Sequence, residues 1–270
     1  MHEVTGEQIK SCCAAAYGSD WAHLLIGDSM HPGGVELTER LGDLLELNPG
    51  SRVLDVASGR GASGLTLARR FGCQVTGIDL SPVCVEAARH EASRSGLVDQ
   101  ARFEIGDAET LGFDDGEFDA VICECAFSTF PDKFNAALGM ARALKPGGRL
   151  GLSDLVRRRE LPPELQTLAG WVACMADAMA ESDYIDCLET AGFRLQDFEV
   201  HDDALTDLLQ RIRGRLFAAT VLARIGAIDI PAADLDQATE IARAAESAVR
   251  SGSLGYVLMK AVKKSDGEES

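Results

Sequence analysis

Three glycines with a regular spacing and one acid beyond them form the first group that could do chemistry. Gly59, Gly61 and Gly64 stand in the stretch "VLDVASGRGASG", and Asp79 follows further along the chain. Glycines in this pattern let a backbone turn approach a ligand closely, and an acid at this distance can bind ribose hydroxyls. The group predicts a nucleotide-like cofactor at the start of a helix.

Two further acids indicate which cofactor this would be. Asp55 lies at the end of an apolar run, where its charge would repel a pyrophosphate and attract the ammonium of an amino acid. Asp107, in "GDAETLGF", can accept a hydrogen bond from an exocyclic adenine amine. The acids therefore favour a cationic cofactor with an adenine ring over a dinucleotide.

Thiols form the second group of residues that could do chemistry. The chain has eight cysteines, and "ICECAF" places Cys123 and Cys125 on either side of Glu124. If strand geometry persists there, both thiols face one way and Glu124 faces the other. Neither paired C-x-x-C motifs nor an H-E-x-x-H helix occurs, so no structural metal site is predicted.

Strands that alternate with helices must position these groups. Apolar runs predict strands that carry each acid at a carboxyl end, and Ser81 with Pro82 predicts the start of a helix. This alternation indicates a mostly parallel sheet covered by helices on both faces, which is an α/β fold. The predicted strands are 52–57, 74–79, 101–108, 118–124, 149–155, 193–200 and 254–264.

The chain reads as a single domain over 1–270. We expect a helical N-terminal cover (1–34), a cofactor-binding core (35–200) and a helical insertion before the last strand (203–250), which is large enough to act as a lid. The acidic tail 265–270 is predicted to be disordered.

Composition narrows the classes of partner. A formal charge of −17 opposes binding to nucleic acid or to anionic lipid. The chain has no apolar run long enough to span a bilayer and no secretion signal, so we expect a cytoplasmic protein that acts on small molecules. The number of subunits cannot be read from the sequence.

The motifs "DVASGRG", "GDAETLGF" and "ALKPGGRLGLSDL" occur in an order that resembles the class I S-adenosylmethionine-dependent methyltransferases, over roughly 35–200. The resemblance implies a Rossmann-like seven-stranded sheet with an antiparallel last strand, and S-adenosyl-L-methionine as cofactor. Ala57 stands where the family has its first loop glycine. The cofactor-binding residues implied are Tyr17, Asp55, Ala57, Ser58, Gly59, Gly61, Asp79 and Leu80 on the ribose and methionine side, Asp107 and Ala108 at the adenine, and Cys123 and Glu124 through their backbone.

"ECAFSTFPDK" and "LAGWVACMADAM" are similar to segments of the arsenite methyltransferases. On that resemblance Cys125 and Cys174 hold trivalent arsenic, and Cys12 with Cys13 matches more loosely a cysteine-bearing segment ahead of the core. Soft sulfur ligands suit such a metalloid, whose lone pair would attack the cofactor methyl group without a strong general base. The favoured function is methylation of a thiolate-bound metalloid, arsenite first, either free or as a thiol conjugate.

Other functions stay open. A small organic molecule, thiol or sulfide could be the acceptor, with Tyr17, Trp171, Met175 and Met179 lining an apolar pocket. His31 and His201 are candidate bases in that case. A cofactor-binding protein without turnover and a nicotinamide-dependent oxidoreductase are the remaining alternatives.

Overall fold

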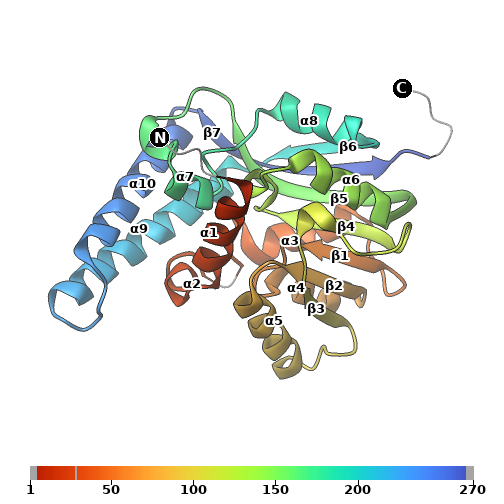
Figure 1. The fold of residues 1–270 in the computed structure, drawn as a ribbon, viewed down its shortest axis with the longest axis horizontal. Helices are drawn as coiled ribbons and strands as arrows, with labels where there is room; N and C mark the ends of the chain where they lie inside the picture. The colour runs from red at the N-terminus through yellow and green to blue at the C-terminus, as the bar shows by residue number, and fades with distance from the viewer. Residues whose placement is uncertain (1–4, 28, 266–270) are drawn as a thin grey trace.

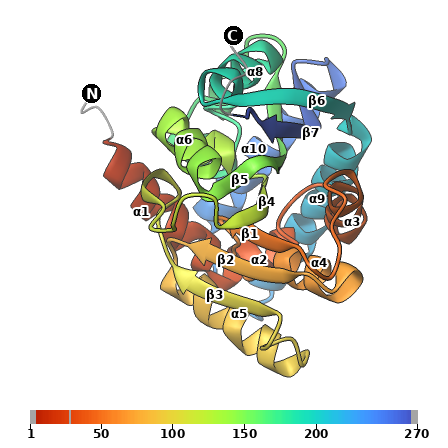
Figure 2. The same cartoon turned by 90° about the vertical axis from the view of Figure 1, so that its right-hand side faces the viewer.

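A computed structural model of the chain describes residues 5–27 and 29–265. One seven-stranded sheet has the strand order β3-β2-β1-β4-β5-β7-β6, and Figure 2 shows it from β3 at the bottom to β6 at the top. All neighbours are parallel except β7, which runs antiparallel to β5 and β6. The strands are β1 (Arg52–Val56), β2 (Gln74–Asp79), β3 (Ala101–Ile105), β4 (Phe118–Glu124), β5 (Leu144–Arg157), β6 (Phe193–Val200) and β7 (Leu254–Lys263).

Helices connect and cover these strands (Figure 1). They are α1 (Gly6–Gly18), α2 (Asp20–Ile26), α3 (Gly34–Leu44), α4 (Ala62–Phe71), α5 (Pro82–Arg94), α6 (Lys133–Ala143), α7 (Leu168–Val172), α8 (Glu181–Thr190), α9 (Asp202–Arg224) and α10 (Ala232–Arg250). Short 3-10 turns are η1 (Ala108–Thr110), η2 (Phe127–Thr129) and η3 (Pro163–Leu165). The predicted α/β architecture with an antiparallel last strand is confirmed.

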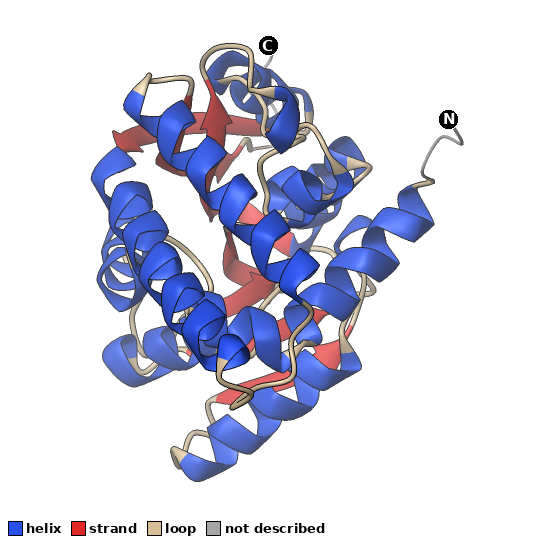
Figure 3. Ribbon diagram, turned by 90° about the vertical axis from the view of Figure 1, so that its left-hand side faces the viewer, coloured by secondary structure: helices blue, strands red, loops and turns tan. Residues whose placement is uncertain are grey.

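Burial on both faces explains why the strands are nearly continuously apolar. Val53 packs in one core cluster and its neighbour Leu54 packs in another, because successive side chains leave a strand on opposite faces. Figure 3 shows helices lying in front of the sheet on the side turned away from Figure 2. A third, smaller cluster joins α2, α9 and α10.

Local capping sets where the helices begin. The Ser81 hydroxyl accepts a hydrogen bond from the Cys84 amide at 3.4 Å and Pro82 opens α5, as the sequence predicted. Thr5 and Gln8 form a reciprocal capping box at the start of α1. Helix α2 lies within the predicted helical N-terminal cover (1–34), for which no separate second helix was predicted.

The segment 203–250 forms a long antiparallel helix pair, α9 and α10, that extends from one side of the molecule (Figure 1). No helix within 5–27 or 29–265 is both long and apolar enough to cross a membrane. The part of the predicted disordered tail at 266–270 lies outside the described residues.

Candidate functional site

A cavity of about 1020 Å³, including its open mouth, lies at the carboxyl ends of β1 to β4. This edge is where ligands bind in open parallel sheets. Residues from the strand ends form its strand-end half: Asp55, Ala57, Ser58, Gly59, Asp79, Leu80, Gly106, Asp107, Ala108 and Glu124. Residues from α1 and from the segment after β4 form its cover half: Lys10, Cys13, Ala14, Tyr17, Cys125, Ala126, Thr129, Phe130 and Pro131.

The glycine-rich loop between β1 and α4 turns through left-handed backbone conformations. Ala57, Gly59 and Gly61 have φ angles of 58°, 53° and 83°. A side chain at Gly59 would meet no protein atom within 4 Å, so the backbone there faces open space. Ala57 is the costly residue, because its Cβ opposes this conformation by roughly 1 kcal/mol. Alanine in place of the family's first loop glycine therefore strains the backbone at residue 57 and also adds a methyl group.

Asp79 organises this loop. One of its carboxylate oxygens, Oδ2, accepts a hydrogen bond from the Gly59 amide at 2.8 Å, and Oδ1 accepts one from the Ser81 amide at 2.8 Å. Burial raises the pKa of Asp79, whereas these two amide donors lower it. The side chain thus holds the glycine loop and presents its carboxylate to the cavity, as binding of ribose hydroxyls would require.

A pair of buried acids lies deeper in the strand-end half. The Gly64 amide donates to Asp55 Oδ2 at 3.0 Å, and the Thr38 hydroxyl donates to Glu124 Oε2 at 2.9 Å. His31 Nε2 lies 3.7 Å from the same Glu124 oxygen. Burial, and next the nearby charge of Glu124, raises the pKa of Asp55 to about 8. Such a site favours a ligand that brings positive charge.

Helix α1 covers the cavity from end to end. At one end the Lys10 ammonium bridges Asp107 Oδ2 at 2.8 Å and Glu109 Oε2 at 2.5 Å. At the other end the Tyr17 hydroxyl donates to the Val172 carbonyl at 2.8 Å. The predicted adenine acid, Asp107, is thus already in contact with a cation from the cover.

The two cysteines of "ICECAF" diverge. Cys123 is fully buried inside β4 and packs in the core cluster of Leu54, whereas Cys125 lies beyond the strand and packs against the cluster of Val53. The expectation that both thiols face one way is wrong, because Cys125 has a left-handed φ of 53° that ends the strand alternation. Only the Cys125 side chain reaches the cavity.

Cys125 and Cys174 lie next to each other. The Cys174 thiol donates to the Cys125 carbonyl at 3.1 Å and lies 3.2 Å from the Tyr17 hydroxyl. A hydrogen bond between the two thiols, and next burial, raises the pKa of Cys125 well above its ordinary value. Burial, followed by neighbouring thiol charges, raises the pKa of Cys13 to about 12. The thiols of Cys13 and Cys125 are therefore protonated near neutral pH.

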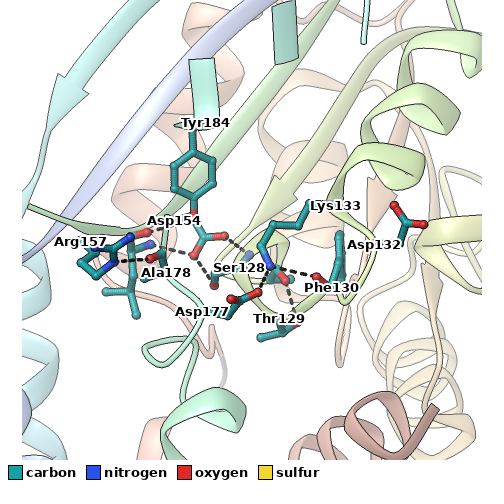
Figure 4. A network of polar contacts seen from close by, with 12 residues as sticks. Ser128, Thr129, Phe130, Asp132, Lys133, Asp154, Arg157, Asp177, Ala178 and Tyr184 are labelled. Carbon is teal, nitrogen blue, oxygen red and sulfur yellow. Dashed lines mark hydrogen bonds and ion pairs between the residues drawn. The ribbon is translucent and has the colours of Figure 1, made fainter. Parts of the chain in front are cut away.

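A polar network behind the cavity fixes the segments that carry Cys125 and Cys174 (Figure 4). Asp154 accepts hydrogen bonds from the Ser128 amide at 2.7 Å and the Ser128 hydroxyl at 2.8 Å. Lys133 donates to the Phe130 carbonyl at 2.9 Å and pairs with Asp177. The network thus ties the turn after β4 to the segment after α7.

The structure gathers most of the predicted site residues and leaves some aside. Cys13, Tyr17, Cys125 and the predicted strand-end residues line one cavity, except for Gly61 and Cys123. Cys12 and Cys174 are not among the lining residues, although Cys174 touches Tyr17. Met175 and Met179 pack in the core clusters instead, and the Trp171 side chain lies outside the described residues.

Several residues of the site had no assigned role in the sequence analysis. Lys10, Ser63, Lys133 and Asp154 contribute through contacts between distant segments, for which no local motif exists. His31 was considered only as a general base, yet its Nε2 faces the Thr38 hydroxyl at 3.3 Å in the strand-end half. The Pro and Gly residues that follow His31 indicate a loop, and this was the only sign in the sequence that the segment could reach the site.

Comparison with known proteins gives one family and several relatives. Residues 47–209 match the family model described as a methyltransferase domain. Methyltransferase GfsG of Streptomyces halstedii is 32% identical over 69% of this chain and 66% of its own length. An arsenite methyltransferase of Halobacterium salinarum is 29% identical over 58% of this chain and 40% of its own length. The chain thus spans only part of the length of the curated relatives that it matches.

Solved structures share the fold. A phosphoethanolamine N-methyltransferase of Haemonchus contortus, in complex with phosphomonomethylethanolamine and S-adenosylhomocysteine, has a TM-score of 0.77 and 19% sequence identity. The similarity covers 97% of this chain and 60% of that one. At this identity the likeness concerns the arrangement of strands and helices alone.

Proposed function

The chain belongs to the class I S-adenosylmethionine-dependent methyltransferases, and we propose that it transfers the cofactor's methyl group to a small molecule bound beneath α1. The observation that carries the proposal is the cavity at the carboxyl ends of β1 to β4, with acids on the strand ends and helix α1 above them. A cofactor on the strand-end half would turn its methyl group toward the cover half.

The strand-end half fits the cofactor in chemical terms. The Ser58 hydroxyl is buried, lines the cavity and has no hydrogen-bond partner among the described residues. Asp79 would hold the ribose hydroxyls, Asp107 and Ala108 the adenine, and the backbone at Glu124 the methionine end. The buried acids Asp55 and Glu124 would complement the ligand's positive charge.

The bound cofactor supplies a methyl group on a sulfonium, which is strongly electrophilic. What the protein must add is alignment of the acceptor and exclusion of water. Burial raises the pKa of the Tyr17 hydroxyl, and the thiols of Cys13 and Cys125 are protonated for the reasons given above. These groups are poor bases near pH 7, so the reacting atom of the acceptor must be nucleophilic by itself.

Arsenite is the second candidate acceptor, and the contact between Cys125 and Cys174 favours it. Two adjacent thiols could exchange their protons for a trivalent metalloid, which binds soft sulfur strongly. Among residues 5–27 and 29–265, however, no three metal-binding side chains converge. A third sulfur ligand would have to come from a movement of Cys13 or from a thiol conjugate of arsenite.

Two measurements test these proposals. Calorimetry with S-adenosylmethionine and with NADH decides the cofactor, and binding of NADH alone would contradict the methyltransferase function. Methylation of arsenite with glutathione is then compared among wild type, Cys125→Ser, Cys174→Ser and the control Cys187→Ser, which alters a half-buried thiol on α8. The metalloid proposal requires loss of activity in the first two variants only.

Other outcomes of the second assay are equally informative. Equal activity in all variants would mean that the thiols only pack. If wild type binds the cofactor but methylates no arsenic, the organic or thiol acceptor remains, and a panel of phenols, amines and thiols becomes the next substrate screen.

A further inference from the structure

The cavity separates charge in a way that bears on the acceptor. Its four described acids, Asp55, Asp79, Asp107 and Glu124, all belong to the strand-end half. Lys10 is the charged residue of the cover half, and Arg60, from the glycine-rich loop, is a second basic residue among the described lining residues. A ligand on the cover side therefore meets alanine, proline, phenylalanine, thiols and hydroxyls.

Each basic side chain at the cavity is already engaged. Lys10 forms ion pairs with two carboxylates, Asp107 and Glu109, so its charge is more than neutralised. His31 lies beside Glu124, and Arg60 donates from Nη2 to the Gly18 carbonyl at 3.4 Å. An anion in the cavity would therefore compete with carboxylates for Lys10 and His31, and with the Gly18 carbonyl for Arg60.

The polar groups of the cover half also point elsewhere. The Thr129 hydroxyl donates to the Ala126 carbonyl at 2.6 Å, and the Tyr17 hydroxyl donates to the Val172 carbonyl. Both can still accept a hydrogen bond, but neither has a proton left to stabilise an anion. Apolar contact with Ala14, Ala126 and Phe130 would therefore account for most of the acceptor's binding.

An anionic acceptor would carry a large penalty here. Removing a charged group from water without a partner costs several kcal/mol. The formal charge of −17 adds repulsion at longer range. A cationic acceptor meets the opposite difficulty, because the acids lie on the half that the positively charged cofactor would occupy.

We infer that the acceptor is an uncharged, largely apolar small molecule, and that phosphorylated acceptors are excluded. The inference rests on the proposed function and extends it to the substrate class. Relatives of this fold include a protein solved with a phosphorylated ligand, so the fold alone does not dictate this choice. In this chain the contacts of Lys10, His31 and Arg60, together with the apolar lining of the cover half, support it.

The test compares two probes of matched shape, 2-naphthol and 2-naphthyl phosphate. Their affinities are measured by calorimetry on protein saturated with S-adenosylhomocysteine, so that no turnover is needed. We expect 2-naphthol to bind at least about tenfold more tightly, a difference of about 1.4 kcal/mol. Equal or tighter binding of the phosphate, or no binding of 2-naphthol at millimolar concentration, would overturn the inference.

A pair of variants sharpens the test. Ala14 lines the cavity, whereas its neighbour Ala15 is exposed on α1 and does not. Ala14→Lys should improve the affinity for 2-naphthyl phosphate at least about tenfold, and Ala15→Lys should leave it unchanged. Equal gains in both variants would mean that general surface charge decides, and no gain in Ala14→Lys would place the acceptor elsewhere.

The same samples separate this inference from the proposed function. Failure of S-adenosylhomocysteine to bind would contradict the function itself. Normal cofactor binding with a preference for the phosphorylated probe would contradict only the substrate class. Thermal unfolding of both lysine variants establishes that they are folded.

Discussion

The two halves of the cavity are built by different means. In the strand-end half, backbone amides of the glycine loop and of helix starts hold the acids Asp55 and Asp79, and both partners lie within about twenty residues. The other two acids of this half, Glu124 and Asp107, receive hydrogen bonds from distant residues. In the cover half, contacts join segments far apart in the chain, such as Tyr17 with Cys174. A rigid local motif can bind a common cofactor, whereas a cover assembled from distant segments can change with the acceptor.

The largest expected effect falls on the strand-end half. Asp79→Ala removes the acceptor of two amide hydrogen bonds together with the predicted ribose contact, so cofactor affinity should fall by about 3 kcal/mol, roughly a hundredfold. Calorimetry measures this, with Glu104→Ala on exposed β3 as the control. Retained affinity in Asp79→Ala would show that the loop does not depend on this acid.

The raised pKa of a buried acid in the strand-end half predicts that cofactor affinity depends on pH. The folded-state pKa of Asp55 is about 8, above its ordinary 3.8, so the acid is mostly protonated at pH 7 and opposes folding increasingly as pH rises from about 4 to 8. A cationic cofactor favours the ionised form. Its affinity should therefore rise by up to about tenfold per pH unit between pH 6 and 8, and then level off.

Calorimetry in two buffers of different ionisation enthalpy checks this second prediction through the proton released on binding. Asp55→Asn should give a flat profile over the same range. An affinity that falls as pH rises, or proton uptake at pH 7, would contradict the assigned environment of Asp55.

A smaller effect is expected in the polar network that supports the cover half. Lys133→Met breaks the pair with half-exposed Asp177 and should lower the free energy of unfolding by about 1 kcal/mol, while cofactor affinity changes less than twofold. Hydrogen exchange should speed up in the segment 173–178. The control Lys145→Met breaks a similar pair with Asp119, at the opposite end of the sheet. Loss of cofactor affinity in Lys133→Met would mean that the two halves are not separable.

The smallest effect concerns the loop itself. Ala57→Gly relieves a left-handed alanine but adds flexibility to the unfolded chain, so the net gain in unfolding free energy should be about 0.5 kcal/mol. Ala87→Gly, in the interior of α5, should instead destabilise by about 1 kcal/mol. Thermal unfolding measures the change in stability of each variant. A loss of stability in Ala57→Gly would contradict the proposed backbone strain at Ala57.

Sequence reasoning worked where structure is determined locally. The predicted strands at 74–79, 118–124 and 193–200 have the observed bounds, because apolar runs and the residues that follow them mark strand ends. The acids on those ends could be placed for the same reason. Helix α2 was missed because its seven residues are too few to show a helical repeat of apolar positions.

The cover half was less predictable for a physical reason. The alternation of side chains predicts which face of the sheet a residue lies on only while the strand continues. Cys125 has a left-handed backbone conformation that ends the strand, and no glycine in the sequence marks this position. The Lys10 contact with Asp107 joins residues 97 positions apart, which no motif encodes. Such pairings follow from the packing of α1 across the finished sheet.

Helix α1 has a kinetic consequence. It contacts the adenine-side acid through Lys10 and the segment after α7 through Tyr17, so one rigid element restrains both ends of the cavity. We expect exchange of the cofactor and the acceptor to be slower while both contacts hold, even though the cavity has an open mouth. The order of binding and the rate of product release should therefore depend on a single opening motion, and the residence time of the spent cofactor is expected to limit turnover.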